Sequence, residues 1–344
     1  MDKIKLIIPK ISLYAIAVAV LFLPLKTSLS NFGLILFIVA SLVNVFINGC
    51  RWYILKELNF YLLTTIALFL PVLIGLLYTP NIKEGVELTG RLVLYGIIPF
   101  CLLQKNIDSK KMFSVIFYAL LIGCVLSMLY LHAINFYHYF FTNSDYTLKK
   151  LFGYNYTGLS FVASLKDMHP VYLGAYYLTF LSMLGSNKIE LKLLYKIIIA
   201  LLISSTVLIL NSRVIIFLLI LIIVKLTFKW FQENKKYLWV VLGGMVIIFF
   251  LVKNTYVYTK MFKGTIWELT DNVETKGIDS KKVGDSRMAR WLVAIDLIKE
   301  KPLIGHGTGV ERETLTSAYN QLGMEVSGQN KFNAHNQYLG YAID

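Results

Sequence analysis

The chain has 344 residues, of which 57% are hydrophobic and 16% are charged, with a mean hydropathy of +0.63 and a formal net charge of +14. Soluble domains are about 45–50% apolar and about 25% charged, so this composition excludes a soluble globular enzyme, a disordered chain and a coiled coil. The three cysteines lie in or beside apolar runs and match no metal-ligand spacing, which excludes a disulfide framework. A polytopic membrane protein remains.

Apolar segments of the right length recur along the chain. A helix that crosses a bilayer needs roughly 20 mostly apolar residues. In chain order, nine segments are predicted to be such spans: residues 8–25, 31–48, 60–78, 86–103, 112–134, 170–185, 191–210, 214–231 and 237–252. The first segment is too long, and too poor in small residues that suit cleavage, to be a removed signal peptide. We therefore expect an all-α fold, in which residues 1–252 form a polytopic transmembrane helical bundle.

The distribution of basic residues predicts the orientation of this bundle. The positive-inside rule favours a cytoplasmic N-terminus, because the inner segments then carry 15 Lys and Arg residues and the short outer segments carry 7. The inner segments alone supply +10 of the net charge of +14. The positive net charge therefore mainly reflects membrane topology, and it gives no support to nucleic-acid binding.

One region does not fit a bundle of hairpins. Residues 253–334 are polar and mixed in charge, with 12 Lys and Arg and 10 Asp and Glu. The parity of the spans places this region outside, and connections of this length are usually functional. We expect one large extracytoplasmic loop that contains short amphipathic helices. Residues 335–344 look like the start of a tenth span, so we expect the chain to be a fragment of a longer protein.

The loop contains a candidate helix with an unusual arginine. Arg287 and Trp291 share the apolar face of a segment that Asp285 or Ser286 can cap and that Pro302 ends. Such a helix is expected to lie along the outer membrane surface, with Arg290 at the edge of its apolar face. The alternative is an arginine that merely reaches the lipid phosphates. The glycine-rich run at 305–309 lacks the pattern of a phosphate loop and is expected to be a turn.

Two further polar positions lie at predicted membrane boundaries. Arg213 stands in a tight turn between two apolar spans, where an ionisable residue is a functional hypothesis by default, although an interfacial anchor is the simpler alternative. His335 stands where the loop re-enters the membrane, and His169 begins a span on the same side. A histidine can accept a proton near neutral pH, but a lone histidine at an interface is more often a satisfied polar group. No Asp-x-Asp pair occurs, so no divalent metal is expected.

These motifs together resemble a known family. The run Ser286-Arg287, Trp291 and Lys301-Pro-Leu-Ile-Gly-His-Gly-Thr-Gly309, followed by Ala334-His-Asn-Gln-Tyr-Leu339, is similar to the signature domain of O-antigen ligases and related Wzy-type polymerases. The Asn211-Ser-Arg213 turn resembles that family's Ser-Arg motif. The resemblance covers residues 190–344 by motif and the whole chain by topology. The family continues for further spans after the His-Asn motif, and those are absent here.

The resemblance implies a membrane glycosyltransferase of the C-type architecture that inverts the anomeric centre and needs neither metal nor another cofactor. Its donor would be an undecaprenyl-diphosphate-linked glycan, and its acceptor would be lipid A–core or another glycan on the periplasmic face of the bacterial inner membrane. By position, His335 matches the proposed base, and Arg213 and Arg287 match the diphosphate-binding arginines. Residues to which we assign candidate supporting roles are Asn336, His169, Ser212 and Arg290.

Three other functions are open at this point. A polysaccharide polymerase or a protein O-glycan ligase of the same superfamily would use the same chemistry on a different acceptor. A secondary transporter is the alternative from another class. Against it, no pair of interrupted helices recurs in two halves, and the loop at 253–334 has little use in a transporter.

Overall fold

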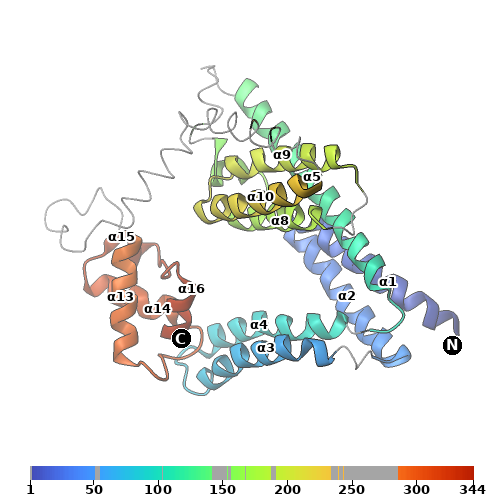
Figure 1. Ribbon diagram of the computed structural model, residues 1–344. Helices are drawn as coiled ribbons and strands as arrows, with labels where there is room; N and C mark the ends of the chain where they lie inside the picture. The colour runs from blue at the N-terminus through green and yellow to red at the C-terminus, as the bar shows by residue number, and fades with distance from the viewer. Residues whose placement is uncertain are drawn as a thin grey trace. The chain divides into compact units, whose positions relative to one another are not determined.

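The computed structural model describes residues 2–50, 55–102, 104–141, 156–166, 168–186, 191–233 and 286–344, together with residues 153, 239 and 243. In these parts the fold is built from helices and contains no strand, only an isolated bridge between Cys50 and Gln104. The protein is therefore an all-α membrane protein, as its composition predicts (Figure 1).

The described helices are long in the N-terminal two thirds and short near the C-terminus. They are α1 (Asp2–Phe22), α2 (Thr27–Asn48), α3 (Leu55–Gly75), α4 (Ile82–Leu102), α5 (Ser109–Phe141), α7 (Leu159–Val162), α8 (Pro170–Leu184), α9 (Leu193–Ile209), α10 (Arg213–Glu233), α13 (Arg287–Glu300), α14 (Glu311–Gln321), α15 (Glu325–Gln329) and α16 (Gln337–Ile343). They divide between two compact units. Unit 1 is Met1–Cys50 with Gln104–Phe262, and unit 2 is Arg51–Leu103 with Lys263–Asp344.

Eight of the nine apolar segments predicted from the sequence coincide with helices, namely α1 to α5 and α8 to α10. Among the described residues, three stretches are long and apolar enough to cross a membrane: Lys5–Phe22, Thr27–Asn48 and Ser109–His138. Helices α8 and α9 are shorter and also apolar. The expected ninth span, residues 237–252, lies outside the described residues apart from Trp239 and Gly243.

Helix α5 extends beyond the apolar run that predicted it, from 112–134 to Ser109–Phe141. Aromatic residues continue the helix past its apolar centre. Phe136 stacks on Phe140 with ring centroids 5.8 Å apart, and the rings of Tyr137 and Phe141 are 5.2 Å apart. Side chains four residues apart are neighbours on a helix and stabilise it when they pack, so this last part of α5 is helical without a continuous aliphatic sequence.

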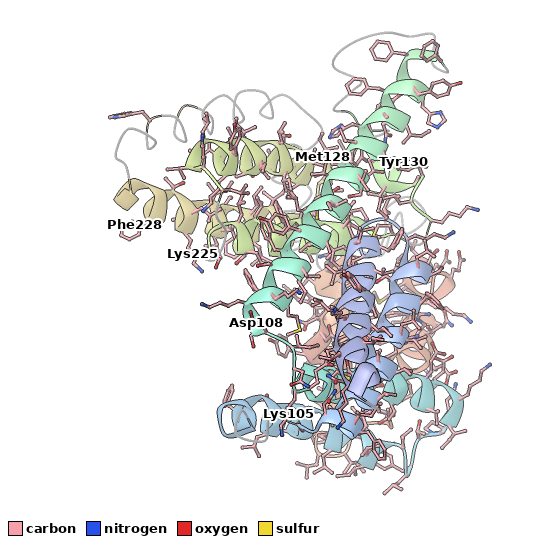
Figure 2. The ribbon with its side chains drawn as sticks, turned by 90° about the vertical axis from the view of Figure 1, so that its right-hand side faces the viewer. Lys105, Asp108, Met128, Tyr130, Lys225 and Phe228 are labelled. Atoms are coloured by element: carbon pink, nitrogen blue, oxygen red, sulfur yellow. The ribbon has the colours of Figure 1, made fainter. Side chains whose placement is uncertain are left out.

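The core of unit 1 lies between α5, α8, α9 and α10. Phe117, Tyr177 and Phe180 are fully buried there, and the rings of Phe117 and Phe180 stack at 5.3 Å. Met128 contacts this core, whereas Tyr130, on the opposite side of α5, is exposed (Figure 2). Many large apolar side chains on the outer faces of these helices are exposed in the same way, which is the pattern expected of helices that face lipid rather than water.

Helices α1 and α2 pack as a close antiparallel pair (Figure 1). Gly33 allows the close approach, because a Cβ atom at that position would lie 2.5 Å from the backbone nitrogen of Ala19. Small residues at helix interfaces serve this purpose in membranes, where close packing replaces the hydrophobic effect as the force between helices.

A buried polar cluster links Gln104, which precedes α5, to α1 and α2 by hydrogen bonds. The amide nitrogen Nε2 of Gln104 donates to the hydroxyls of Ser12 (2.9 Å) and Ser41 (3.0 Å), and Nδ2 of Asn44 donates to Oε1 of Gln104 (2.8 Å). All four side chains are at most 1% exposed. Because buried polar groups are costly unless they are hydrogen-bonded, this cluster specifies how the chain passes from residue 104 into α5.

Unit 2 contains the α3–α4 hairpin and a cluster of short helices, α13 to α16. The cluster has its own apolar core, in which Ala294, Leu315, Tyr319 and Met324 are fully buried. The large loop predicted from the sequence therefore contains a packed helical subdomain in its described part, residues 286–334.

The glycine-rich run at 305–309 joins that subdomain to the α3–α4 turn. Gly305, Gly307 and Gly309 all have positive φ, at 66°, 115° and 85°. A Cβ on Gly307 would lie 2.7 Å from the Cα atom of Thr79. Between these glycines, Thr308 donates its hydroxyl to the carbonyl of Val72 (2.8 Å) and accepts a hydrogen bond from the Thr79 hydroxyl on its own carbonyl (2.9 Å). The predicted turn is confirmed, and it is also a docking site for the α3–α4 hairpin.

Candidate active site

The candidate residues fall into two sets. Unit 1 contains His169, Ser212 and Arg213, and unit 2 contains Arg287, Arg290, His335 and Asn336. The structure brings Ser212 and Arg213 into one turn of unit 1. In unit 2 it brings both Arg290 and His335 against the ring of Phe332.

In unit 1, the turn between α9 and α10 presents Arg213 as the first residue of α10. The reversal uses Asn211, which is 2% exposed and has a φ of 51°. Left-handed backbone is several-fold enriched in asparagine over other non-glycine residues, so this residue type suits the position. The carbonyl of Ser212 accepts the N–H of Ile216 at 2.9 Å, which is the first turn of α10. Arg213 itself is half-buried.

In unit 2, Arg287 holds the same position on a different helix. It is the first residue of α13, directly after Ser286, whose hydroxyl oxygen accepts the N–H of Ala289 at 3.1 Å as an N-cap. Both arginines therefore follow a serine and begin a helix. The helix macrodipole makes this end positive, so a cation here is disfavoured by roughly 0.3–1 kcal/mol and an anion is favoured. Two helix starts that each carry a guanidinium are suited to bind phosphate groups.

The predicted helix at Arg287 is confirmed in its start and its end before Pro302, but its buried face differs from the expectation. The buried residues are Ala289, Arg290, Val293, Ala294 and Leu297. Arg290 is thus 6% exposed, and its expected place at the edge of the apolar face is wrong. Packing of α13 against α14 and α16 inside the subdomain, and not a membrane surface alone, determines which side is covered.

An aromatic ring lies beside the buried Arg290. Its guanidinium carbon is 5.1 Å from the ring centroid of Phe332. The same ring lies 6.0 Å from the imidazole of His335, measured between centroids. The face of an aromatic ring attracts a cation, so Phe332 both accommodates Arg290 and contacts the predicted base. No role for Phe332 was predicted from the sequence.

His335 is exposed and has left-handed backbone, with a φ of 52°. Its backbone N–H donates to Oδ1 of Asn333 at 3.3 Å. Asn336, which follows, caps α16: its Oδ1 accepts the N–H groups of Tyr338 (3.1 Å) and Leu339 (3.4 Å). The His-Asn pair thus consists of an accessible imidazole and a helix cap that fixes the residue beside it.

The residue before this pair, Ala334, is fully buried, and both of its backbone polar groups are bound by side chains. Nε1 of Trp291 donates to the Ala334 carbonyl at 2.9 Å, and the Ala334 N–H donates to Oε1 of Glu311 at 3.1 Å. Burial raises the pKa of the Glu311 carboxyl, while the Ala334 N–H and the charge of Arg312 act in the opposite direction. Sequence reasoning missed Glu311, because nothing local distinguishes it from Glu313, an exposed acid two residues later.

His169 and two histidines outside the predicted site have structural surroundings of their own. Nδ1 of His169 accepts the N–H of Val171 at 3.2 Å and so caps α8. Nε2 of His306 donates to the carbonyl of Leu297 at 3.1 Å. His138 lines a cavity of about 280 Å³ in unit 1 together with Asn135 and Ser164. Among the described residues, no three His, Cys, Asp or Glu side chains gather where they could hold a metal ion.

Comparison with known proteins finds a similarity in the C-terminal part of the chain. Residues 198–344 match the family model Wzy_C, described as O-antigen ligase. No curated protein and no solved structure matches the chain. The matched region includes Arg213, Arg287 and His335, and it confirms the resemblance seen in the motifs. Residues 198–344 are therefore similar to the Wzy_C family of O-antigen ligases.

Proposed function

We propose that the protein transfers a glycan from undecaprenyl diphosphate to an acceptor on the periplasmic face of the bacterial inner membrane, in O-antigen ligation to lipid A–core. The observation that carries this proposal is the repeated Ser-Arg helix start. Arg213 and Arg287 both lie in the region that matches the O-antigen ligase family, and both occupy the first residue of a helix. Each helix start, taken by itself, favours an anion such as a phosphate group.

His335 serves as the general base in this proposal. Its exposed imidazole accepts the proton of the acceptor hydroxyl. The oxygen then attacks the anomeric carbon from the side opposite the diphosphate, which inverts the centre. The bond between that carbon and the diphosphate oxygen breaks, and undecaprenyl diphosphate leaves with the bonding electron pair.

The arginines neutralise the charge that develops on the leaving diphosphate. A guanidinium forms two parallel hydrogen bonds to phosphate oxygens, and such donors are most effective where charge develops in the transition state. Because this charge source needs no metal, we expect EDTA to leave the transfer rate unchanged. Loss of activity with EDTA that magnesium or manganese restores would contradict this role of the arginines.

The supporting residues act through the backbone. Asn336 caps α16 next to the base, His169 caps α8, and Ser212 precedes Arg213 at the start of α10. Arg290 supports the site through the ring of Phe332, which contacts His335. None of these four residues is proposed to touch the reacting atoms.

The acceptor distinguishes the members of this superfamily. A polysaccharide polymerase would extend a second lipid-linked glycan, and a protein O-glycan ligase would use a hydroxyl of a protein. The decisive measurement is transfer by the purified full-length protein from a lipid-diphosphate glycan to a panel of three acceptors: lipid A–core, a lipid-linked glycan and a protein. Label transferred to lipid A–core alone supports O-antigen ligation.

The same assay tests the base. We expect His335→Ala to lower the rate by roughly 10²–10⁴-fold, the usual contribution of general-base catalysis, at an unchanged unfolding temperature. His138→Ala, at another exposed histidine, is the matched control and should retain the wild-type rate. If His335→Ala stays within a few-fold of wild type, His335 is not the base.

A further inference from the structure

The peptide groups on either side of Ala334 are fixed by side chains from two different helices. Trp291 of α13 donates to the Ala334 carbonyl, and Glu311 of α14 accepts from the Ala334 N–H. Most buried backbone groups are bound by other backbone groups, in helices, sheets and turns. Ala334 is therefore unusual, because side chains bind both its N–H and its C=O. It lies directly before the predicted base.

We propose that Trp291 and Glu311 are positioning residues that hold His335 in its left-handed conformation and so aim its imidazole at the acceptor. This inference rests on the proposed function of His335 as the general base. It assigns no contact between either residue and substrate.

We call the contacts of Trp291 and Glu311 with Ala334 the clamp, and the backbone of His335 explains why it is useful. A non-glycine residue with positive φ is uncommon, and sparsely populated conformations persist only where the surroundings over-determine them. Here Asn333 binds the N–H of His335, and Asn336 caps the helix that follows. The Trp291–Ala334–Glu311 contacts fix the chain on the other side, so the imidazole projects from a backbone held at both ends.

The packing around Glu311 supports a precise role for its carboxylate. Its atoms fill the space above Gly340 of α16, where a Cβ atom would lie 2.9 to 3.0 Å from them. The carboxylate is thus confined between Gly340 and the Ala334 N–H. A side chain held this tightly transmits the position of α14 to the backbone next to His335.

Trp291 gives the clamp a second consequence. It lies four residues after Arg287 on α13, so the two side chains are neighbours on one helix. The helix that presents the proposed diphosphate-binding arginine is therefore the helix that holds the backbone beside the base. Movement of α13 would displace Arg287 and the backbone beside His335 together. The distance between the arginine and the base would therefore change little.

Three variants of the full-length protein test this inference in the transfer assay. Trp291→Phe keeps an aromatic ring and removes only the N–H donor. Glu311→Ala removes the acceptor, whereas Glu311→Gln retains an acceptor oxygen. Because a misplacement of about 1 Å can cost about 10²-fold in rate, we expect Trp291→Phe and Glu311→Ala to lower kcat by about 10- to 100-fold. KM for the lipid-linked donor should stay within twofold, and Glu311→Gln should keep a near-wild-type kcat.

The controls separate positioning from general stability. Trp239→Phe and Glu313→Ala make the same chemical changes at exposed positions and should leave kcat unchanged. A kcat within twofold of wild type for both Trp291→Phe and Glu311→Ala overturns the inference, as does a rise in KM at constant kcat. If Glu311→Ala does not fold, Trp291→Phe alone decides.

The parallel His335→Ala measurement keeps the two proposals apart. If His335→Ala loses activity while the clamp variants retain it, only the positioning role fails. If His335→Ala retains activity, the proposal that His335 is the base is wrong, and the positioning role of Trp291 and Glu311 is wrong with it.

Discussion

At the scale of single residues, the site is built from side chains in positions that cost stability. Arg213 and Arg287 begin helices, where a positive charge opposes the macrodipole. His335 adopts a backbone conformation that few side chains prefer. Strain of this kind gathers at functional sites, where the surrounding structure maintains it. An anion bound at either helix start would relieve the repulsion at the arginine of that helix.

The geometry of the guanidinium leads to the first prediction. We expect Arg213→Lys and Arg287→Lys each to lower the transfer rate by at least tenfold, because lysine keeps the charge but loses the planar fork that binds two phosphate oxygens. Arg91→Lys, at an exposed arginine paired with Glu87 on α4, is the control and should be silent. Wild-type rates for both Arg213→Lys and Arg287→Lys would indicate general electrostatic attraction instead of bidentate binding, because lysine keeps the charge. The measurement is the initial rate of transfer from a lipid-diphosphate glycan.

The buried carboxyl of Glu311 gives a pH prediction. Burial raises its pKa in the folded state, so above the unfolded value of about 4.3 the folded protein binds more protons than the unfolded chain. The contribution of this group to stability is therefore largest at low pH and is lost as pH rises through the folded pKa. The charge of Arg312 lowers this pKa, and the Glu311 N–H donates to Oδ1 of Asp344, a carboxyl whose own pKa burial raises to about 6.

Glu311→Gln removes this titration while keeping an acceptor for Ala334. The unfolding temperature of the variant, relative to wild type, should thus be higher at pH 7.5 than at pH 4.5 (our chosen measurement points, about three units apart, spanning the ordinary pKa of glutamate). Glu313→Gln on the same helix turn is the control and should follow the wild-type curve. A constant difference between Glu311→Gln and wild type across this range would show that the carboxyl is not perturbed by burial. Thermal unfolding in detergent provides the data.

At the scale of helices, close packing of α1 on α2 depends on Gly33. A side chain there would collide with the backbone of Ala19, and overpacking typically costs about 1–3 kcal/mol. We expect Gly33→Ala to lower the unfolding temperature in detergent. Gly90→Ala is the matched control on α4, because a Cβ there meets nothing within 4 Å. It should be neutral or stabilising, since alanine favours a helix over glycine. Equal effects at both glycines would mean that α1 and α2 do not pack closely.

Sequence patterns predicted helices better than contacts between them. Hydropathy located eight apolar helices, although the end of α5 lies at Phe141 and not at residue 134, because an apolar segment that crosses a bilayer must satisfy its backbone hydrogen bonds internally, as a helix does. The Trp291–Ala334 and Glu311–Ala334 contacts join residues 43 and 23 positions apart. Arg290 was misplaced for the same reason. Periodicity assigns a residue to a face of its own helix but does not say what covers that face.

At the scale of the whole molecule, the distribution of basic residues predicts an orientation that can be measured. With a cytoplasmic N-terminus, α14 and the rest of the loop at 253–334 face the periplasm. We expect a cysteine introduced by Lys299→Cys, an exposed position on α13, to react with a membrane-impermeant thiol reagent in intact spheroplasts. Lys110→Cys, exposed at the start of α5, should react only after the membrane is opened. The three native cysteines are buried and give little background. The opposite labelling pattern would reverse the orientation and move the site to the cytoplasm.

The contact between Thr308 and the α3–α4 turn also sets an order of events during synthesis. The hydrogen bond to Val72 joins residues 236 positions apart. Ribosomes add about 5–20 residues per second, so Thr308 is made on the order of 10–50 s after its partner. Throughout that interval the turn between α3 and α4 lacks its hydrogen bonds to Thr308. Closure of unit 2 is therefore a late step in the biogenesis of this protein, and a chain that stops before residue 305 leaves the hairpin permanently uncovered.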